Sequence, residues 1–290
     1  MQVIRAEILG FCFGVRRAVE IAQKALNEKS GETVFTLGPL IHNENVLKDF
    51  EKKGLKIIQS DEIDSLNENS VVIIRAHGTS PEIQEKLMRS KAKVIDATCP
   101  RVKNSQNIVK ELSEKKDIVI FTGDKNHGEV KSIEGYGKNN FVLVQNAQEA
   151  EEFCLKTEKN EDSEVLLLSQ TTFSNSEFKK IAEIIQKKFK NTEIKNTICP
   201  ATRERQESLI DLCKKCEAVI VIGGKNSANT NRLFKIASKN CKKATFIQDE
   251  NGIESDFFAD FKTVGLTAGA STPDILIESV ENLLKNEKVK

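Results

Sequence analysis

The sequence predicts an α/β protein made of three similar small domains with mostly parallel sheets. Short β-branched runs alternate with longer, charged segments of helical period, as expected when helices cover parallel strands. In addition, three cysteines about 90 to 100 residues apart each stand where an apolar run ends and a helix-like pattern begins: Cys12, Cys99 and Cys199. A length of 290 residues allows two or three domains. We therefore expect domains at 1–97, 98–197 and 198–290.

The elements follow this alternation in order. In the first domain the β-branched runs predict strands at 34–37, 71–75 and 93–97, with amphipathic helices at 17–28 and 81–89. In the second we expect strands at 117–122, 141–145, 164–169 and 193–198, with helices at 102–115 and 177–188. In the third we expect strands at 218–222, 245–248 and 263–266, with helices at 203–214 and 230–238.

The three cysteines are candidate metal ligands. Pro100 and Pro200 suit the first position of a helix, so Cys99 and Cys199 are expected at or beside an N-cap, where the helix dipole favours a thiolate. The alternative is that all three are ordinary buried cysteines. The repeated context favours three lobes that each bring one thiolate to a shared centre. A site with three thiolates leaves one metal position open for chemistry.

Polar, glycine-bearing loops follow the predicted strands, where open α/β sheets bind ligands. All three histidines of the chain fall in such loops: His42, His77 and His127. Together with hydroxyl and amide donors, imidazoles can bind a polyanion. The loop 223–229 lacks the spacing of a nucleotide-binding phosphate loop, and we interpret it as a cradle for a diphosphate.

Glu129 is the candidate proton donor, although spacing alone does not select it. Glu44 lies two residues after His42, as Glu129 does after His127. Glu129 is favoured because the intervening Gly128 lets the backbone approach a ligand. A carboxyl group near a metal and an anion can have a raised pKa and act as an acid.

Composition restricts the possible partners and compartment. The net charge is +1, with basic and acidic residues interspersed, so nucleic acid and membrane surfaces are not expected as partners. Arg5 and Glu7 interrupt the only early apolar stretch, which argues against a signal peptide. Seven cysteines, an odd number, favour a reducing cytoplasm. The pair Cys213 and Cys216 lacks a second pair and is interpreted as structural, and Cys154 and Cys241 as inert.

The motifs in order resemble those of the 4-hydroxy-3-methylbut-2-enyl diphosphate reductases of the non-mevalonate isoprenoid pathway. The resemblance runs from the segment around Cys12 to Thr267-Ala268-Gly269-Ala270-Ser271-Thr272-Pro273. It implies three α/β domains around a central 4Fe–4S cluster, held by Cys12, Cys99 and Cys199. Three protein thiolates leave one iron free for a substrate ligand.

The resemblance also implies roles for the loop residues. Glu129 would deliver protons, helped by Thr171 and His127, and substrate would contact His42, His77, His127, Thr171, Ser227, Asn229 and Ser271. The implied reaction is a reductive dehydroxylation to isopentenyl and dimethylallyl diphosphate, with electrons from a donor such as ferredoxin or flavodoxin. In one departure, Ala228 stands where the family often has a second serine.

Two other classes of protein remain open at this point. A non-redox hydro-lyase could use the same open-iron cluster without consuming electrons, so dependence on a reductant separates it from a reductase. An iron–sulfur or zinc sensor would have little use for three histidines, a glutamate and an anion cradle.

Overall fold

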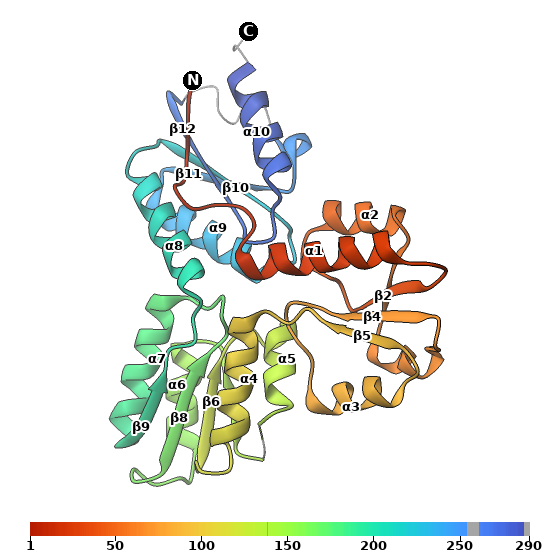
Figure 1. Ribbon diagram of the computed structural model, residues 1–290. Helices are drawn as coiled ribbons and strands as arrows, with labels where there is room; N and C mark the ends of the chain where they lie inside the picture. The colour runs from red at the N-terminus through yellow and green to blue at the C-terminus, as the bar shows by residue number, and fades with distance from the viewer. Residues whose placement is uncertain (138, 254–260, 287–290) are drawn as a thin grey trace. The chain divides into compact units, whose positions relative to one another are not determined.

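The computed structural model describes residues 1–137, 139–253 and 261–286. It contains three four-stranded, wholly parallel sheets with helices between the strands (Figure 1), so the predicted α/β class is confirmed. The chain divides into two compact units. Unit 1 comprises Met1–Arg16, Ile41–Asp49 and Pro200–Lys290, and unit 2 comprises Arg17–Leu40 and Phe50–Cys199.

The first sheet of unit 2 has the strand order β3-β2-β4-β5. Its core includes Val72, Ile74 and Leu87, all less than a tenth exposed. The strands are β2 (Thr33–Leu37), β3 (Leu55–Ile58), β4 (Ser70–Ile74) and β5 (Lys93–Asp96), and the helices between Phe13 and Arg89 are α1 (Phe13–Glu28), α2 (Glu44–Lys52), the 3-10 turn η1 (Ser60–Ser65) and α3 (Pro81–Arg89).

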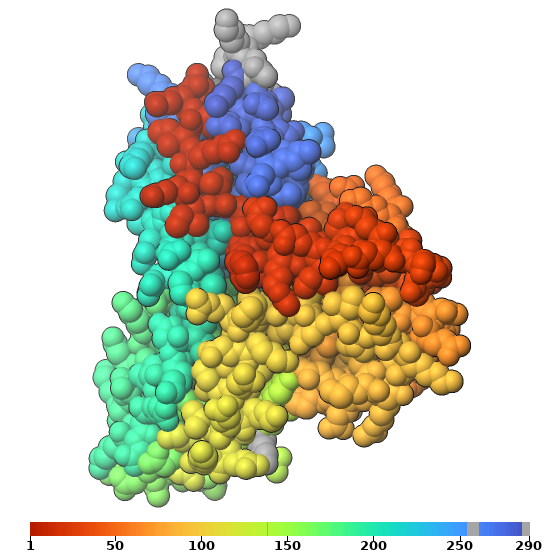
Figure 2. All heavy atoms as spheres, in the orientation of Figure 1, coloured from red at the N-terminus to blue at the C-terminus, as the bar shows by residue number. Residues whose placement is uncertain are grey.

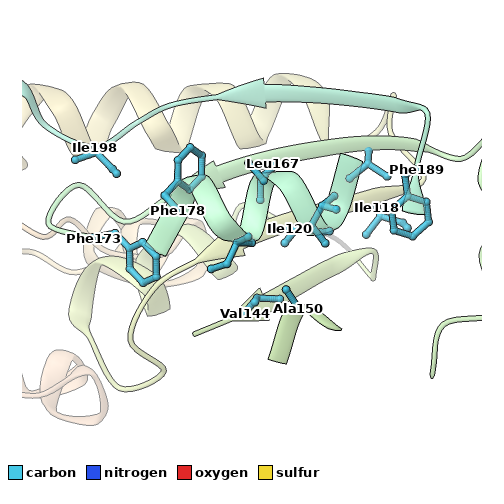
Figure 3. Close-up of a cluster of buried hydrophobic side chains, with 13 residues drawn as sticks. Ile118, Ile120, Val144, Ala150, Leu167, Phe173, Phe178, Phe189 and Ile198 are labelled. Carbon is cyan, nitrogen blue, oxygen red and sulfur yellow. The ribbon is translucent and has the colours of Figure 1, made fainter. Parts of the chain in front are cut away.

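The second sheet of unit 2 has the order β7-β6-β8-β9 and is buried on both faces. Ile118, Ile120 and Leu167 contribute to one core cluster (Figure 3), and the alternate residues Val119 and Phe121 to another. This explains why the two central strands carry continuous apolar runs, at 118–121 and 165–168. The elements are β6 (Ile118–Thr122), β7 (Phe141–Val144), β8 (Glu164–Ser169), β9 (Asn191–Lys195), α4 (Pro100–Leu112), α5 (Gly128–Glu134), α6 (Ala147–Lys156) and α7 (Asn175–Lys188).

The sheet of unit 1 has the order β11-β10-β12-β1, so the first strand of the chain pairs with the last described one. Gln2 lies opposite Thr263 and Arg5 opposite Leu266. Arg5 also pairs with Glu281 of the final helix, and Figure 2 shows the red N-terminal segment against the blue C-terminal helix. The elements are β1 (Gln2–Arg5), α8 (Pro200–Cys213), β10 (Ala218–Ile222), α9 (Ala228–Asn240), β11 (Lys243–Ile247), η2 (Glu250–Gly252), β12 (Thr263–Ala268) and α10 (Asp274–Asn286).

The three sheets share one plan that is permuted in the chain. Written from the edge strand of each, their orders are β3-β2-β4-β5, β7-β6-β8-β9 and β11-β10-β12-β1. Strands β5, β9 and β1 therefore hold equivalent places, and each leads to one of the three cysteines. The domain bounds 1–97, 98–197 and 198–290 stay a prediction, but residues 1–16 and 41–49 group with the C-terminal sheet rather than with the rest of 1–97. No local pattern could show this, because β1 pairs with a strand far along the sequence.

Several elements were not expected from the pattern. Strands β1 and β3, of four residues each, were among them. Helix α5 begins at a glycine and has seven residues, and α2, α6 and α10 were also not expected. None of the described helices is long and apolar enough to cross a membrane.

Candidate active site

The three candidate cysteines occupy equivalent positions in the three sheets. Each cysteine lies between an edge strand of its sheet and the next helix, directly before the helix. Cys12 lies between β1 and α1, Cys99 between β5 and α4, and Cys199 between β9 and α8. Each backbone N–H donates to a carbonyl in the loop after the neighbouring strand, at 3.1, 2.9 and 2.9 Å respectively, with acceptors Ala270, Ala76 and Thr171. The expected N-cap position is confirmed for Cys99. The fold thus repeats one cysteine-presenting turn three times.

In unit 2, the Glu129 carboxylate is fixed by Thr171. Glu129 is 1% exposed. Its Oε1 accepts the Thr171 N–H and its Oε2 accepts the Thr171 hydroxyl, both at 2.7 Å. The Thr171 carbonyl in turn accepts the Cys199 N–H. Thr171 therefore contacts both the predicted proton donor, Glu129, and a candidate metal ligand, Cys199.

His127 and His77 continue this set of contacts. His127 caps α5, and its Nδ1 accepts the Glu129 N–H at 3.2 Å. An accepting Nδ1 assigns the proton of a neutral imidazole to Nε2, which can then donate to a ligand. The His77 ring lies edge-on to the His127 ring, with centroids 4.9 Å apart, and its neighbour Ala76 accepts the Cys99 N–H. Contacts thus run without a break from Cys199 through the predicted catalytic residues to Cys99.

In unit 1, His42 and Ser271 meet through the His42 carbonyl, which accepts the Ser271 hydroxyl at 3.1 Å. Gly224 is required here because a Cβ at this position would lie 2.2 Å from the same carbonyl oxygen. The Gly223-Gly224 pair therefore lets the β10 loop approach His42 closely. A positive φ of 157° at Gly223 adds to the need for glycine.

Asn229 is the most informative side chain in unit 1. It is 4% exposed, yet neither its Nδ2 nor its Oδ1 has a hydrogen-bond partner among the described residues. A buried, unsatisfied amide is costly unless a ligand completes it. Ser227 caps the same helix α9, where its Oγ accepts the Thr230 N–H at 3.3 Å. Donors at a helix N-terminus suit a phosphate, so these residues fit an anionic ligand.

The structure also shows positioning residues that the sequence reading missed. Arg205, 2% exposed, donates to the Gly10 carbonyl at 2.7 Å and so holds the turn before Cys12. Arg17 donates to the Thr98 carbonyl at 3.2 Å, beside Cys99. Gln170 accepts the Asp124 N–H at 2.9 Å and ties the loop before His127 to the loop of Thr171. A charged residue on the apolar face of α8, in line with Leu209, was the available signal for Arg205.

The remaining cysteines have the character of structural thiols. Burial raises the pKa of Cys213 and of Cys216 to about 11, with a further contribution from Cys241 nearby. Cys241 Sγ contacts the Glu217 carbonyl at 3.3 Å. A thiol with so high a pKa is a poor metal ligand and a poor nucleophile, which supports the structural interpretation of this pair.

The donor set fits an iron–sulfur cluster. Thiolates are the usual ligands of such clusters, and none of Cys12, Cys99 and Cys199 forms a disulfide in the described structure. The loops beside them carry a buried carboxylate and imidazoles instead of a fourth cysteine.

Solved structures and sequence relatives agree with this geometry. A reductase from Treponema denticola, 4-hydroxy-3-methylbut-2-enyl diphosphate reductase, is 45% identical over 98% of this chain and 99% of its own length. A Thermoanaerobacter protein of the same name is 41% identical over 97% of this chain and 95% of its own.

Among structures, the E-1-hydroxy-2-methyl-but-2-enyl-4-diphosphate reductase from Plasmodium falciparum matches with a TM-score of 0.92 at 27% identity, covering 99% of this chain and 89% of that one. A second, described as the terminal enzyme of the non-mevalonate pathway, matches with a TM-score of 0.70 at 38% identity over 98% and 99%. The model of the LytB protein family matches residues 3–285. With its three cysteine-presenting turns and this match over nearly its whole length, the chain belongs to the LytB family.

Proposed function

We propose that the chain is a 4-hydroxy-3-methylbut-2-enyl diphosphate reductase that uses a 4Fe–4S cluster held by Cys12, Cys99 and Cys199. The observation that carries the proposal is the repetition of one cysteine-presenting turn in all three sheets, in a member of the LytB family. The reaction takes up two electrons and two protons, releases water, and gives isopentenyl and dimethylallyl diphosphate. When bound, a cluster with one iron free of protein thiolate supplies the electrons and a Lewis acid.

The chain's own residues would bind the diphosphate and exclude water from it. Asn229, Ser227 and Ser271 are each less than a tenth exposed and carry donors. We propose that they hold the diphosphate together with His42, His77 and His127. Ala228 removes one hydroxyl from this set, but it is the first residue of α9, so its backbone N–H can take that place.

Glu129 and Thr171 would form the proton relay. Glu129 Oε1 accepts the backbone N–H of Thr171, and a backbone N–H cannot accept a hydrogen bond from a protonated Oε1. When Glu129 is protonated, its proton therefore belongs on Oε2. Oε2 lies 2.7 Å from Thr171 Oγ1, and the hydroxyl can receive a proton from Oε2 while passing its own to the substrate. In this scheme Thr171 transfers the proton, and His127 orients Glu129 through its N-cap contact.

The donor of electrons and the compartment follow from the same proposal. A small reductant protein such as ferredoxin or flavodoxin would supply electrons one at a time. Three reduced ligand cysteines require a reducing compartment, for which we propose the cytoplasm.

The test is turnover by protein purified without oxygen. With a reduced viologen dye as the electron source, we expect the allylic alcohol diphosphate to yield isopentenyl and dimethylallyl diphosphate, with dye oxidised at two electrons per product. Mössbauer spectra should report the cluster type. Turnover without any reductant would favour the hydro-lyase, and absence of iron after anaerobic purification and reconstitution would refute the cluster.

A further inference from the structure

Arg75 is a cation enclosed by backbone on two sides. It directly follows β4 and is two residues from His77. A Cβ at Gly38 would lie 3.0 Å from its Nη1, and a Cβ at Gly128 would lie 2.6 Å from its Nη2. With the guanidinium where it lies, a side chain at either position would crowd it, and the two glycines leave it this space. Burial lowers the pKa of Arg75.

Arg75 differs from the other partly buried arginines in having no acceptor for its guanidinium within the described part of the chain. Arg17 donates to the Thr98 carbonyl, and Arg205 donates to the Gly10 carbonyl. Removing a charge from water without a compensating partner is unfavourable. The arrangement is therefore that of a cation held ready for an anion.

Arg75 lines a cavity of about 260 Å³ in unit 2. Lys131 adds a second cation to its lining, and none of its lining residues is acidic. Hydroxyl groups come from Ser60, Thr79, Ser80 and Ser132. The space is ample for a tetrahedral oxyanion and several waters.

The hydroxyls of this cavity are set up to donate. Ser132 Oγ accepts from Gln106 Nε2 at 2.7 Å, and Ser80 Oγ accepts the Ile83 N–H at 3.4 Å. Each hydroxyl has its own hydrogen left for another partner. The loop carrying Arg75 is also fixed, because the Gly78 N–H donates to the Arg75 carbonyl at 2.9 Å.

We propose that the Arg75 cavity is a second anion site, which binds inorganic phosphate or the phosphoryl group of a small phosphate ester. The lining includes two cations, four hydroxyl side chains and no carboxylate, and a guanidinium matches the geometry of phosphate oxygens. None of the residues proposed to hold the substrate lines this cavity. Gly128 separates the two, since a Cβ there would contact Arg75 Nη2 at 2.6 Å on one side and the His77 Cβ at 3.4 Å on the other.

The test is calorimetric titration of the anaerobic, cluster-containing protein with inorganic phosphate and, in a second arm, with glycerol 3-phosphate. Arg75→Met should weaken binding about 10-fold or more, since it removes a charge-assisted contact. The matched control is Arg89→Met, which removes an exposed guanidinium outside the cavity and should change the affinity less than about 2-fold. Tighter binding of the ester identifies the bound form as a phosphorylated metabolite, and tighter binding of phosphate identifies the free ion.

Two further measurements cover the case that Arg75→Met does not fold and locate the bound anion directly. If Arg75→Met loses its circular dichroism or its iron, Lys131→Met replaces it and should weaken phosphate binding by a factor of about 3 or more. Crystals of the wild type grown with selenate should show an anomalous peak within hydrogen-bond distance of Arg75. Equal phosphate affinity in the folded variants and in wild type, a selenate peak only at other positions, or complete displacement of phosphate by saturating isopentenyl diphosphate would each overturn the proposal.

Discussion

Replacing Glu129 with Gln separates proton delivery from structure. Glutamine has the size of glutamate, and its amide oxygen can keep the contact with the Thr171 N–H at 2.7 Å. Its NH₂ group can donate to Thr171 Oγ1, which reverses the hydrogen bond that now runs from the hydroxyl to Oε2. Both contacts thus survive, but no carboxylic proton is available.

The magnitudes follow from these two contacts. Hydrogen bonds to a charged group contribute about 1.5–3 kcal/mol and neutral ones about 0.5–1.5 kcal/mol. Between the mid-points of these ranges, two such exchanges lower the free energy of unfolding by about 2.5 kcal/mol, and burying a neutral amide instead of a carboxylate offsets part of that loss. Loss of a general acid lowers the rate by about 10² to 10⁴. We therefore expect kcat to fall far more than stability or substrate affinity.

The assay compares Glu129→Gln with Glu134→Gln, an exposed change on the same helix α5. Iron content, substrate Kd from ligand-induced absorption changes, and kcat with reduced viologen are measured for both. The expected pattern is normal iron, a Kd close to wild type and a kcat lowered only in Glu129→Gln. A kcat within a few fold of wild type, with an unchanged pH profile, would show that the proton comes from elsewhere.

Three other predictions concern ligands, substrate and pH. Serine in place of any one proposed cluster ligand should remove the cluster or nearly all activity, whereas Cys213→Ser should keep the iron; the reverse result would contradict the assignment of Cys12, Cys99 and Cys199. Alanine in place of a single site histidine should keep the iron but weaken substrate binding by roughly 1.5–3 kcal/mol, and unchanged affinity in all three variants would refute the anion site of His42, His77 and His127. Lys116, 13% exposed, bonds Glu164 and Glu193 at 3.1 Å, and these hydrogen bonds raise its pKa, while hydrogen bonds from Lys195 and then Lys116 lower the pKa of Glu193. The contribution of Lys116 to stability is therefore complete below its unfolded pKa of about 10.4 and is lost as pH rises through its higher folded pKa. The contribution of Glu193 is complete above its unfolded pKa of about 4.3 and is lost as pH falls through its lower folded pKa. The difference in Tm between wild type and Lys116→Met should stay constant from about pH 6 to 9 and shrink outside it, and a difference that is flat down to about pH 3 would argue against these contacts.

Much of the fold could be predicted because the central strands carry their own signal. Strand β10, Ala218–Ile222, is completely buried. All of its residues are therefore apolar, which is typical of a central strand of a parallel sheet. The edge strand β3 was missed, although β5, an edge strand of the same length, was predicted. The pairing of β1 with β12 was missed because sequence periodicity reports which face of a strand is buried and not which strand lies beside it.

The candidate site was predicted from residue types in loops, and its internal contacts were not. Their spacing from a histidine could not distinguish Glu129 from Glu44. In the structure, Glu129 is 1% exposed and bonds both the N–H and the hydroxyl of Thr171, whereas Glu44 is exposed. No local sequence pattern indicates the surroundings of Arg75, because the glycines beside its guanidinium, Gly38 and Gly128, lie far from it in the chain.

The permuted sheet has a consequence for how the protein is made. The turn that presents Cys12 rests on the Ala270 carbonyl, and β1 has its only described neighbour in β12, about 260 residues later. During synthesis Cys12 therefore lacks its hydrogen bond to Ala270 and its neighbouring strand β12 until nearly the whole chain has left the ribosome. Pairing over so long a separation is slow because loop closure precedes the stabilising contacts. The sheets of β2–β5 and β6–β9 need no such partner and can form first, so insertion of a cluster that needs all three thiolates would be one of the last steps of maturation.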